Sequence, residues 1–289
     1  MEEISCIICG STQRTEFIHL SDRLADQSGK VYYLVQCSCG FVYLNPRPTE
    51  SEIGAFYKHP EYEPYLGDGL LYRMVQNWAL RWKYKKISRT NNRVKGKLLD
   101  IGGGQGGFCS YMKKKGWDTT LQDPNDVVGN RKNNNDLKTI RSLCDLKDDD
   151  KYELITLWHS LEHIHNIEDL YHRIQKHLKS EGILVVAVPN LDAPERKYFN
   201  EDWAPYDAPR HLYHFTPDNL EHLNNRYELS SINTYSLFQD TPYNIILSMK
   251  KKSLFNIIRG LWIWITSALI TLIRGYRFSS SFMVICKKH

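Results

Sequence analysis

The chain has 289 residues, of which 42% are hydrophobic and 25% charged, as in ordinary globular proteins. This length suggests one large domain with a small one, or two modest domains. The formal net charge of +5 is too mild to demand a nucleic-acid partner, and we expect none. The acidic start Met1-Glu2-Glu3 predicts no signal peptide. Seven cysteines, four of them in two tight pairs, favour a reducing cytoplasm over a disulfide scaffold.

Residues 1–48 have the pattern of a small zinc ribbon. The pairs Cys6–Cys9 and Cys37–Cys39 are each followed by glycine and are separated by a strand-like run. Four thiolates supply the tetrahedral soft-ligand shell that Zn²⁺ prefers, and a filled shell makes the ion structural. The second pair is one residue shorter than the usual C-x-x-C. The alternative is two reduced cysteine pairs without metal.

Residues 49–92 are predicted to form a helical connector or lid. Thr49 and Glu52 have capping-box spacing, so a helix is expected to begin after Thr49. The rings of Tyr57 and Tyr65, in the loop that follows, are candidates to cover a cationic ligand, because aromatic faces attract cations. A second helix is expected over 70–90. Its apolar residues have helical spacing, which we interpret as a packing face: Leu71, Met74, Val75, Trp78 and Trp82.

The segment 93–289 alternates short apolar runs with helical patterns. This alternation predicts an α/β domain built on a Rossmann-like, doubly wound, mostly parallel sheet. Gly182 is expected to end a helix that carries Ile167 to Leu178. A further helix is expected over 217–225. Strands are expected at 97–101, 119–122, 154–158, 183–188, 228–238 and 281–286.

A glycine cluster after the first of these strands is the most informative motif. Gly102, Gly104 and Gly107 satisfy the dinucleotide fingerprint G-x-G-x-x-G. Asp100, Gly102, Gly104 and Gly106 instead satisfy D-x-G-x-G-x-G, the glycine motif of S-adenosylmethionine (SAM)-dependent methyltransferases. A carboxylate at position 100 would repel a pyrophosphate at the helix N-terminus but suits the ammonium and sulfonium groups of SAM. The motif therefore favours SAM.

Residues 97–190 resemble a class I SAM-dependent methyltransferase. Beyond the glycine motif, the resemblance rests on Asp123 after the second strand, on Leu161-Glu162-His163 after the strand at 154–158, and on Pro189-Asn190. The ribbon, the segment 45–48 and the segment 209–216 resemble a bacterial subfamily with a zinc-binding N-terminal module. Some members of that subfamily C-methylate nucleotide-activated deoxysugars.

The resemblance implies a SAM site along the glycine motif. Asp100 and Gly102 would lie against the methionine part of the donor, and Cys144 and Asp145 would flank the adenine. Asp123 would take the ribose hydroxyls, which its position after a strand also predicts; the alternative is a turn residue before proline. The predicted cofactor-binding residues are Asp100, Gly102, Gly104, Gly106, Asp123, Cys144, Asp145, His159 and Tyr57.

Methyl transfer from a sulfonium is an in-line displacement, so the protein mainly aligns the reactants. A hydroxyl or an acidic carbon also needs a base that works near neutral pH. We predict His211, His163 and His214 as the catalytic residues. The alternatives are that His163 caps a helix and that His214 is a packed core histidine. His159, Glu162 and His163 also offer a set of metal ligands, although such a cluster alone is weak evidence for a metal.

An apolar insertion at 250–277 lies near the end of the chain. Its core, 254–273, has basic flanks and two tryptophans, which suit a helix lying in the interface of an anionic membrane. The part without charge, 261–273, falls short of the ~20 apolar residues of a spanning helix, because Arg259 interrupts the longer stretch. The alternative is a buried helix or a homodimer interface. Peripheral contact would place a cytoplasmic protein at the inner face of the membrane.

Together these features predict SAM-dependent methyl transfer to a small-molecule or lipid-linked acceptor, such as a sugar or a related metabolite of the cell envelope or of secondary metabolism. SAM and structural Zn²⁺ are the predicted cofactors. One alternative is an NAD(P)-dependent oxidoreductase, against which Asp100 and the Leu-Glu-His segment argue. Another is a non-catalytic zinc-ribbon protein that binds nucleic acid, against which the lack of a dense Lys/Arg cluster in the ribbon argues.

Overall fold

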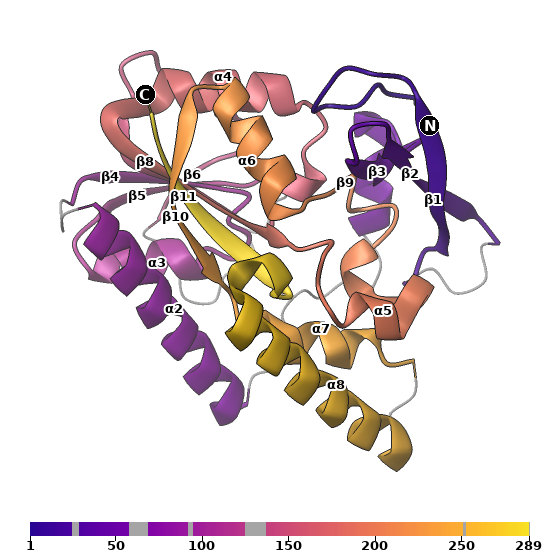
Figure 1. Ribbon diagram of the computed structural model, residues 1–289. Helices are drawn as coiled ribbons and strands as arrows, with labels where there is room; N and C mark the ends of the chain where they lie inside the picture. Colours follow the sequence, from indigo (N-terminus) through magenta and orange to yellow (C-terminus); the bar gives the residue numbers. More distant parts are fainter. Residues whose placement is uncertain (25–28, 58–68, 92–94, 125–136, 251–252, 289) are drawn as a thin grey trace.

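The computed structural model describes residues 1–24, 29–57, 69–91, 95–124, 137–250 and 253–288. Two sheets organise this part of the chain: a central sheet of seven strands and a smaller sheet of four strands beside it (Figure 1). Tyr65, predicted to cover a ligand, lies outside the described residues.

The central sheet is mostly parallel. Its order is β10-β11-β8-β7-β4-β5-β6. The five strands from β8 to β6 run parallel, and β11 is antiparallel to both of its neighbours, β8 and β10. The predicted Rossmann-like α/β fold and the C-terminal strand are therefore confirmed. The strands are β4 (Lys97–Ile101), β5 (Asp118–Gln122), β6 (Lys138–Ile140), β7 (Tyr152–Trp158), β8 (Leu178–Pro189), β10 (Leu229–Ser236) and β11 (Ser281–Lys288).

Helices cover both faces of this sheet, and an apolar core lies on each side. One core receives Leu170 and Ile174, which share a face of α4 because they are four residues apart. The other receives Phe108 and Met112 of α3 in the same way. The longer helices are α2 (Leu70–Thr90), α3 (Gly107–Lys114), α4 (Ile167–His177), α6 (Pro217–Arg226), α7 (Asp240–Ser248) and α8 (Leu254–Arg274).

Short helical segments connect these elements, and one of them starts where the sequence predicts. The N–H of Thr49 donates to Oε2 of Glu52 at 2.9 Å, which completes the expected capping interaction before α1. The short segments are α1 (Glu50–Ile53), η1 (Gly54–Tyr57), η3 (Leu143–Asp145), η4 (Leu161–His163), α5 (Arg196–Phe199), η5 (Asn200–Asp202), η6 (Ala204–Tyr206) and η7 (Gly275–Phe278).

The N-terminal sheet takes its last strand from far along the chain. Its antiparallel order is β1 (Arg14–Ser21), β2 (Val31–Cys37), β3 (Val42–Leu44) and β9 (Tyr213–His214). The ribbon segment is thus joined by backbone pairing to a loop that leaves the central sheet after β8. The predicted domain boundary after residue 48 therefore does not separate two independently packed domains.

Two local predictions are wrong. Gly182 does not end a helix, because α4 stops at His177 and Gly182 lies inside β8. A Cβ at this position would lie 2.8 Å from the side chain of Leu178 and 3.0 Å from the carbonyl oxygen of Tyr152, so close packing explains the glycine. The second error concerns the apolar residues of α2.

The first half of the predicted packing face on α2 faces outward. Met74 and Trp78 are 61% and 53% exposed, and Val75 is also exposed. Packing begins at Leu80 and continues at Trp82, whose ring lies 5.9 Å from that of Tyr235. The side chain of Leu71 lies outside the described residues. Helical spacing therefore identifies an apolar face here but not what that face contacts.

Candidate active site

The glycine loop between β4 and α3 lies at the carboxyl edge of the central sheet. Gly102, Gly104 and Gly106 have φ values of 66°, 52° and 74°, a region that favours glycine. A Cβ at Gly102 would lie 2.5 Å from Cβ of Ser160, which follows β7. The glycines are therefore needed both for the turn and for its close approach to the neighbouring strand end.

The carboxylate of Asp100 lies beneath this loop and is 1% exposed. Oγ1 of Thr156 donates a hydrogen bond to its Oδ1 at 2.6 Å. Burial raises the pKa of Asp100 to about 7, although the Thr156 hydrogen bond and the ammonium of Lys83 act in the opposite direction. The charge of Asp100 consequently changes near neutral pH. Its contact with the methionine part of SAM stays a prediction.

Three further predicted SAM residues lie near the same edge. Oδ2 of Asp123, just after β5, accepts a hydrogen bond from the N–H of Gly104 at 2.9 Å. Cys144 and Asp145 form η3 after β6, and Oδ2 of Asp145 caps this turn by accepting from the N–H of Ser142 at 2.9 Å. Their roles toward ribose and adenine stay predictions.

His159, directly after β7, has an unusual backbone and an unusual partner. Its φ of 51° is rare for a residue with a side chain, and such strain is typical of functional sites. Nε2 lies 3.0 Å from Oδ2 of Asp240, the first residue of α7. Burial lowers the pKa of His159, but the carboxylates of Asp240 and Glu162 outweigh it and raise the pKa to about 9. No local pattern pointed to Asp240, which lies 81 residues away along the chain.

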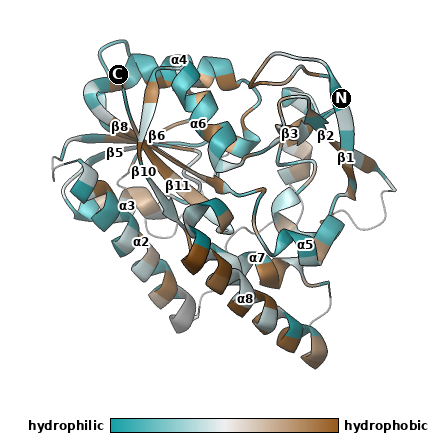
Figure 2. Ribbon diagram, viewed as in Figure 1, coloured by the Kyte–Doolittle hydropathy of each residue, from teal (hydrophilic) through white to brown (hydrophobic). Residues whose placement is uncertain are grey.

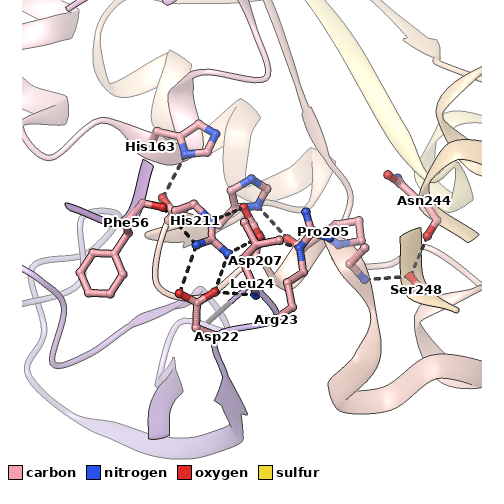
Figure 3. Close-up of polar contacts among 12 residues, drawn as sticks. Asp22, Arg23, Leu24, Phe56, His163, Pro205, Asp207, His211, Asn244 and Ser248 are labelled. Carbon is pink, nitrogen blue, oxygen red and sulfur yellow. Dashed lines mark hydrogen bonds and ion pairs between the residues drawn. The ribbon is translucent and has the colours of Figure 1, made fainter. Parts of the chain in front are cut away.

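His163 and His211 lie against each other, with ring centroids 4.6 Å apart. Nδ1 of His163 is 3.0 Å from the carbonyl oxygen of Arg210, and Nδ1 of His211 is 2.7 Å from that of Pro205 (Figure 3). Because a carbonyl only accepts hydrogen bonds, both Nδ1 atoms carry the proton. In the neutral rings both Nε2 atoms are therefore hydrogen-bond acceptors.

Glu162 completes the cluster with a carboxylate that accepts no hydrogen bond from the described residues. Its side chain is fully buried, and among the described residues neither oxygen has a hydrogen-bond partner. Nδ1 of His159 lies 3.7 Å from Oε1, which is too long for a hydrogen bond. Burial raises the pKa of Glu162, but the histidines around it outweigh burial and lower the pKa to about 2.

The ligand atoms of Glu162, His163 and His211 all lie within 4.8 Å of one another. This acceptor cluster, as we call these three residues, brings together three groups that accept hydrogen bonds. A buried carboxylate without a partner is costly, so the cluster suits a bound group that donates hydrogen bonds or carries positive charge. It could also hold a metal ion, and its members differ from the set His159, Glu162 and His163 considered from the sequence.

The other two predicted residues of this region are placed differently. The hydroxyl oxygen of Tyr57 lies 2.9 Å from the protonated Nδ1 of His163 and accepts from it, so Tyr57 borders the acceptor cluster. His214 lies in β9, is 4% exposed and has its ring 5.6 Å from that of Tyr206. Burial lowers the pKa of His214 to about 3. The alternative of a packed histidine explains this position, and a catalytic role for His214 stays untested.

A buried ion network, which sequence reasoning missed, fixes the loop that carries His211. The guanidinium of Arg210 is fully buried and pairs with Asp22 at 2.8 Å and Asp207 at 2.9 Å. Arg23 adds a second cation 2.7 Å from Asp207 (Figure 3). Asp22 and Arg23 come from the ribbon segment, so that segment supports the acceptor cluster. Only the basic residue in Pro209-Arg210-His211 could have suggested this.

The four cysteines of the ribbon form a second cluster. Their sulfur atoms lie within 4.8 Å of one another, with Cys6 3.6 Å from Cys39 and Cys9 3.4 Å from Cys37. Zn–S bonds of about 2.3 Å in a regular tetrahedron would place the sulfurs about 3.8 Å apart. The donor set and its spacing therefore fit Zn²⁺, and the short second pair does not prevent this.

Comparison with protein families agrees with the fold and the glycine motif. A family model described as a methyltransferase domain matches residues 76–233, more than half of the chain. The fold and site thus define a class I SAM-dependent methyltransferase. The chain belongs to this methyltransferase-domain family. No curated protein sequence matches it.

Solved methyltransferase structures share the fold at low sequence identity. A putative sarcosine dimethylglycine methyltransferase from Galdieria sulphuraria is 16% identical, with a TM-score of 0.52 over 75% of this chain and 88% of that one. The 1,6-didemethyltoxoflavin-N1-methyltransferase of Burkholderia thailandensis, with bound 1,6-didemethyltoxoflavin and S-adenosylhomocysteine, is 13% identical, with a TM-score of 0.50 over 91% and 97%. The neighbours support the fold and leave the acceptor open.

Proposed function

We propose that this methyltransferase transfers the methyl group of SAM to a hydrogen-bond-donating group of a small-molecule or lipid-linked acceptor. A sugar or a related metabolite of the cell envelope or of secondary metabolism is the acceptor class that we favour. The observation that carries this proposal is the acceptor cluster: Glu162, His163 and His211 converge, and the Glu162 oxygens accept no hydrogen bond from the described residues. A sugar hydroxyl or an amine would supply that donor.

The donor would lie along the glycine loop. Gly102, Gly104 and Gly106 leave room for the methionine part, and Asp123 would bind the ribose hydroxyls from the end of β5. Cys144 and Asp145 would border the adenine, and Asp100 would attract the positive charge of SAM from beneath the loop. His159 would contact the donor at the end of β7, between the glycine loop and the acceptor cluster. Support comes from the common position of these residues at the carboxyl edge of the sheet.

His211 is the base that we propose for the transfer step. Burial and the neighbouring His163 lower its pKa to about 4, so Nε2 is unprotonated at neutral pH. As the acceptor atom bonds to the methyl carbon, the C–S bond breaks, S-adenosylhomocysteine leaves, and the acceptor proton passes to Nε2. The carboxylate of Glu162 would stabilise the imidazolium so formed, as carboxylates do beside catalytic histidines. His163 and Tyr57 would orient the acceptor.

We also propose that Cys6, Cys9, Cys37 and Cys39 bind a structural Zn²⁺. The sulfur spacing and the absence of any non-thiol ligand in the set support this. The ion would hold the ends of the ribbon segment together. Asp22 and Arg23 of that segment form ion pairs with Arg210 and Asp207. Zinc would therefore stabilise the position of the acceptor cluster and take no part in the reaction.

Transfer of label from [methyl-³H]SAM tests this function. The purified protein is incubated with aqueous and lipid extracts of a bacterial cell envelope, and the products are separated by phase. We expect calorimetry to show binding of SAM and not of NAD⁺, and we expect label in an extract component that carries hydroxyl or amine groups. Binding of NAD⁺ without SAM, or label confined to a product without such groups, would overturn the proposal.

A further inference from the structure

Helix α8 has the opposite orientation from an ordinary amphipathic helix: its small and polar residues face the protein, and most of its large apolar residues face outward. The residues it turns inward are small or polar with one exception: Gly260, Ile263, Ser267 and Thr271. Its large apolar residues point outward, with Leu272 and Ile273 exposed by 70% and 82%. In Figure 2 the ribbon of α8 carries the brown of hydrophobic residues at many of its positions. Also exposed on α8 are Leu254, Phe255, Ile257, Ile258, Leu261, Trp262, Trp264, Ile265 and Leu269.

Two other helices expose apolar residues on the same side of the molecule. α7 packs against α8, where Gly260 would place a Cβ 3.4 Å from Ile245, and α7 exposes Tyr243 and Ile246. α2 projects from the same side in Figure 1 and exposes Met74, Val75 and Trp78. We call these residues with the outward residues of α8 the apolar face. Soluble proteins rarely expose so continuous an apolar surface unless it contacts a partner.

The segments that form the apolar face carry mostly positive charge. α2 contains six basic residues and no acidic one, and residues 229–289 contain eight basic residues and a single acidic one, Asp240, which faces His159. Lys250 and Arg277 pair with Asp202 and Asp218 at the ends of α8. The rest of the chain has more acidic than basic residues. Positive charge is therefore concentrated in the segments that carry the apolar face, and the rest of the chain is net negative.

From these observations we infer that the apolar face docks in the interface of an anionic lipid bilayer, with α8 lying parallel to the membrane. Outward apolar residues and two tryptophans would enter the headgroup region, and the basic residues would meet lipid phosphates. A second copy of the chain is a poorer occupant, because a two-fold contact would bring basic α2 and α8 against themselves.

A lying helix also fits the packing better than a spanning one. By length and composition, Leu254–Phe278 could cross a membrane, and it is the one such stretch in the described part of the chain. However, its inward residues contact the protein from Gly260 to Thr271, and β11 follows it directly into the central sheet. Spanning would require both contacts to be given up.

This docking would bring the active site to the membrane. Asp240, at the start of α7, contacts His159, and Oγ of Ser248, at its end, accepts from the N–H of Ala204 in η6 at 2.8 Å. α7 therefore joins the apolar face to the loop of His211. If the proposed function holds, the inference narrows the acceptor to a lipid-linked or amphiphilic molecule.

Flotation with vesicles tests the inference. Full-length protein is mixed with phosphatidylcholine vesicles with and without 30% phosphatidylglycerol. We expect binding to the anionic vesicles that falls at least tenfold in 0.5 M salt. Leu261→Glu/Ile265→Glu should lower binding at least tenfold. The control Val31→Glu/Tyr33→Glu adds the same charge at exposed apolar residues of β2 and should bind like the wild type.

Three outcomes would contradict the inference. If wild-type protein floats with neither kind of vesicle, the apolar face does not bind a membrane. If the wild type is a dimer and the Leu261/Ile265 variant is a monomer, the face binds a second copy of the chain. Resistance to alkaline carbonate extraction would indicate a spanning helix. Calorimetry with SAM on the same variants keeps the two proposals apart: the face variants should bind SAM normally, and wild-type protein that floats without binding SAM would remove the proposed function alone.

Discussion

At the scale of single residues, Glu162 defines what the site needs. A fully buried carboxylate faces two histidines whose Nδ1 protons are held by backbone carbonyls. Removing the histidines would be costly, because a buried carboxylate without a charge partner is strongly unfavourable. The protonated ring of His159 lies 3.7 Å from Glu162 and offsets part of this charge, but neither carboxylate oxygen accepts a hydrogen bond from the described residues, and a donor on the acceptor would supply one.

Asp100 should make SAM affinity depend on pH. Its pKa is raised to about 7, chiefly by burial, so it is mostly neutral at pH 6 and mostly ionised at pH 8. Because the ionised form attracts the cationic donor, SAM should bind up to about tenfold more tightly at pH 8 than at pH 6. Calorimetry across this range measures the effect. Asp100→Asn should bind weakly at every pH; a variant that keeps the wild-type pH dependence would remove Asp100 from this role.

Sequence reasoning reached the residues of local motifs and missed their distant partners. His159, Glu162 and His163 follow one strand, so their closeness follows from chain order alone. Asp240 contacts His159 only because α7 packs beside β7, and Asp22 reaches Arg210 across 188 residues. No periodicity or spacing encodes such pairs, so they emerge only from tertiary structure.

At the scale of elements, the strands of the central sheet were predicted except β6, whereas the contacts of helix faces were predicted less well. The bounds of β4 match the prediction because a short apolar run between polar residues has few alternatives. The exposed half of α2 shows the limit: helical spacing of Met74, Val75 and Trp78 is the same whether the partner is a core or a membrane. Gly182 was misread because a glycine required by strand packing looks like a helix end.

The folding of the ribbon segment should depend on bound zinc. Cys9→Ser removes one of four thiolates, and because metal binding contributes to folding free energy, the variant should lose zinc and stability. A loss of about 2 kcal/mol would lower the Tm by about 4–8 °C. Metal analysis and thermal unfolding measure both effects. Cys144→Ser, an exposed cysteine outside the cluster, is the control and should keep its zinc; equal zinc content in Cys9→Ser would contradict the site.

At the scale of the whole molecule, ribbon and methyltransferase domain act as one unit. β9 completes the ribbon sheet, and the Arg210 network ties Asp22 to the loop of His211. The alternation of strands and helices predicted the domain, but the joining of the two parts could not be predicted, because β9 has only two residues.

Arg210→Leu should destabilise the whole molecule. It leaves Asp22 and Asp207 buried without their shared cation, and breaking a buried pair in this way costs about 3–5 kcal/mol. Urea unfolding measures the change. Arg14→Leu removes a surface ion pair with Glu3 and should cost less than about 1 kcal/mol. If the two variants were equally stable, the network would not be what holds the parts together.

The central claim is that His211 acts on the acceptor at a site separate from the donor. The most direct test is the His211→Ala variant, assayed for methyl transfer and for SAM affinity in parallel. Loss of a general base predicts turnover about 10²–10⁴-fold lower, with the Kd for SAM unchanged. Wild-type turnover in this variant, or an equal loss of SAM binding and turnover, would contradict the account.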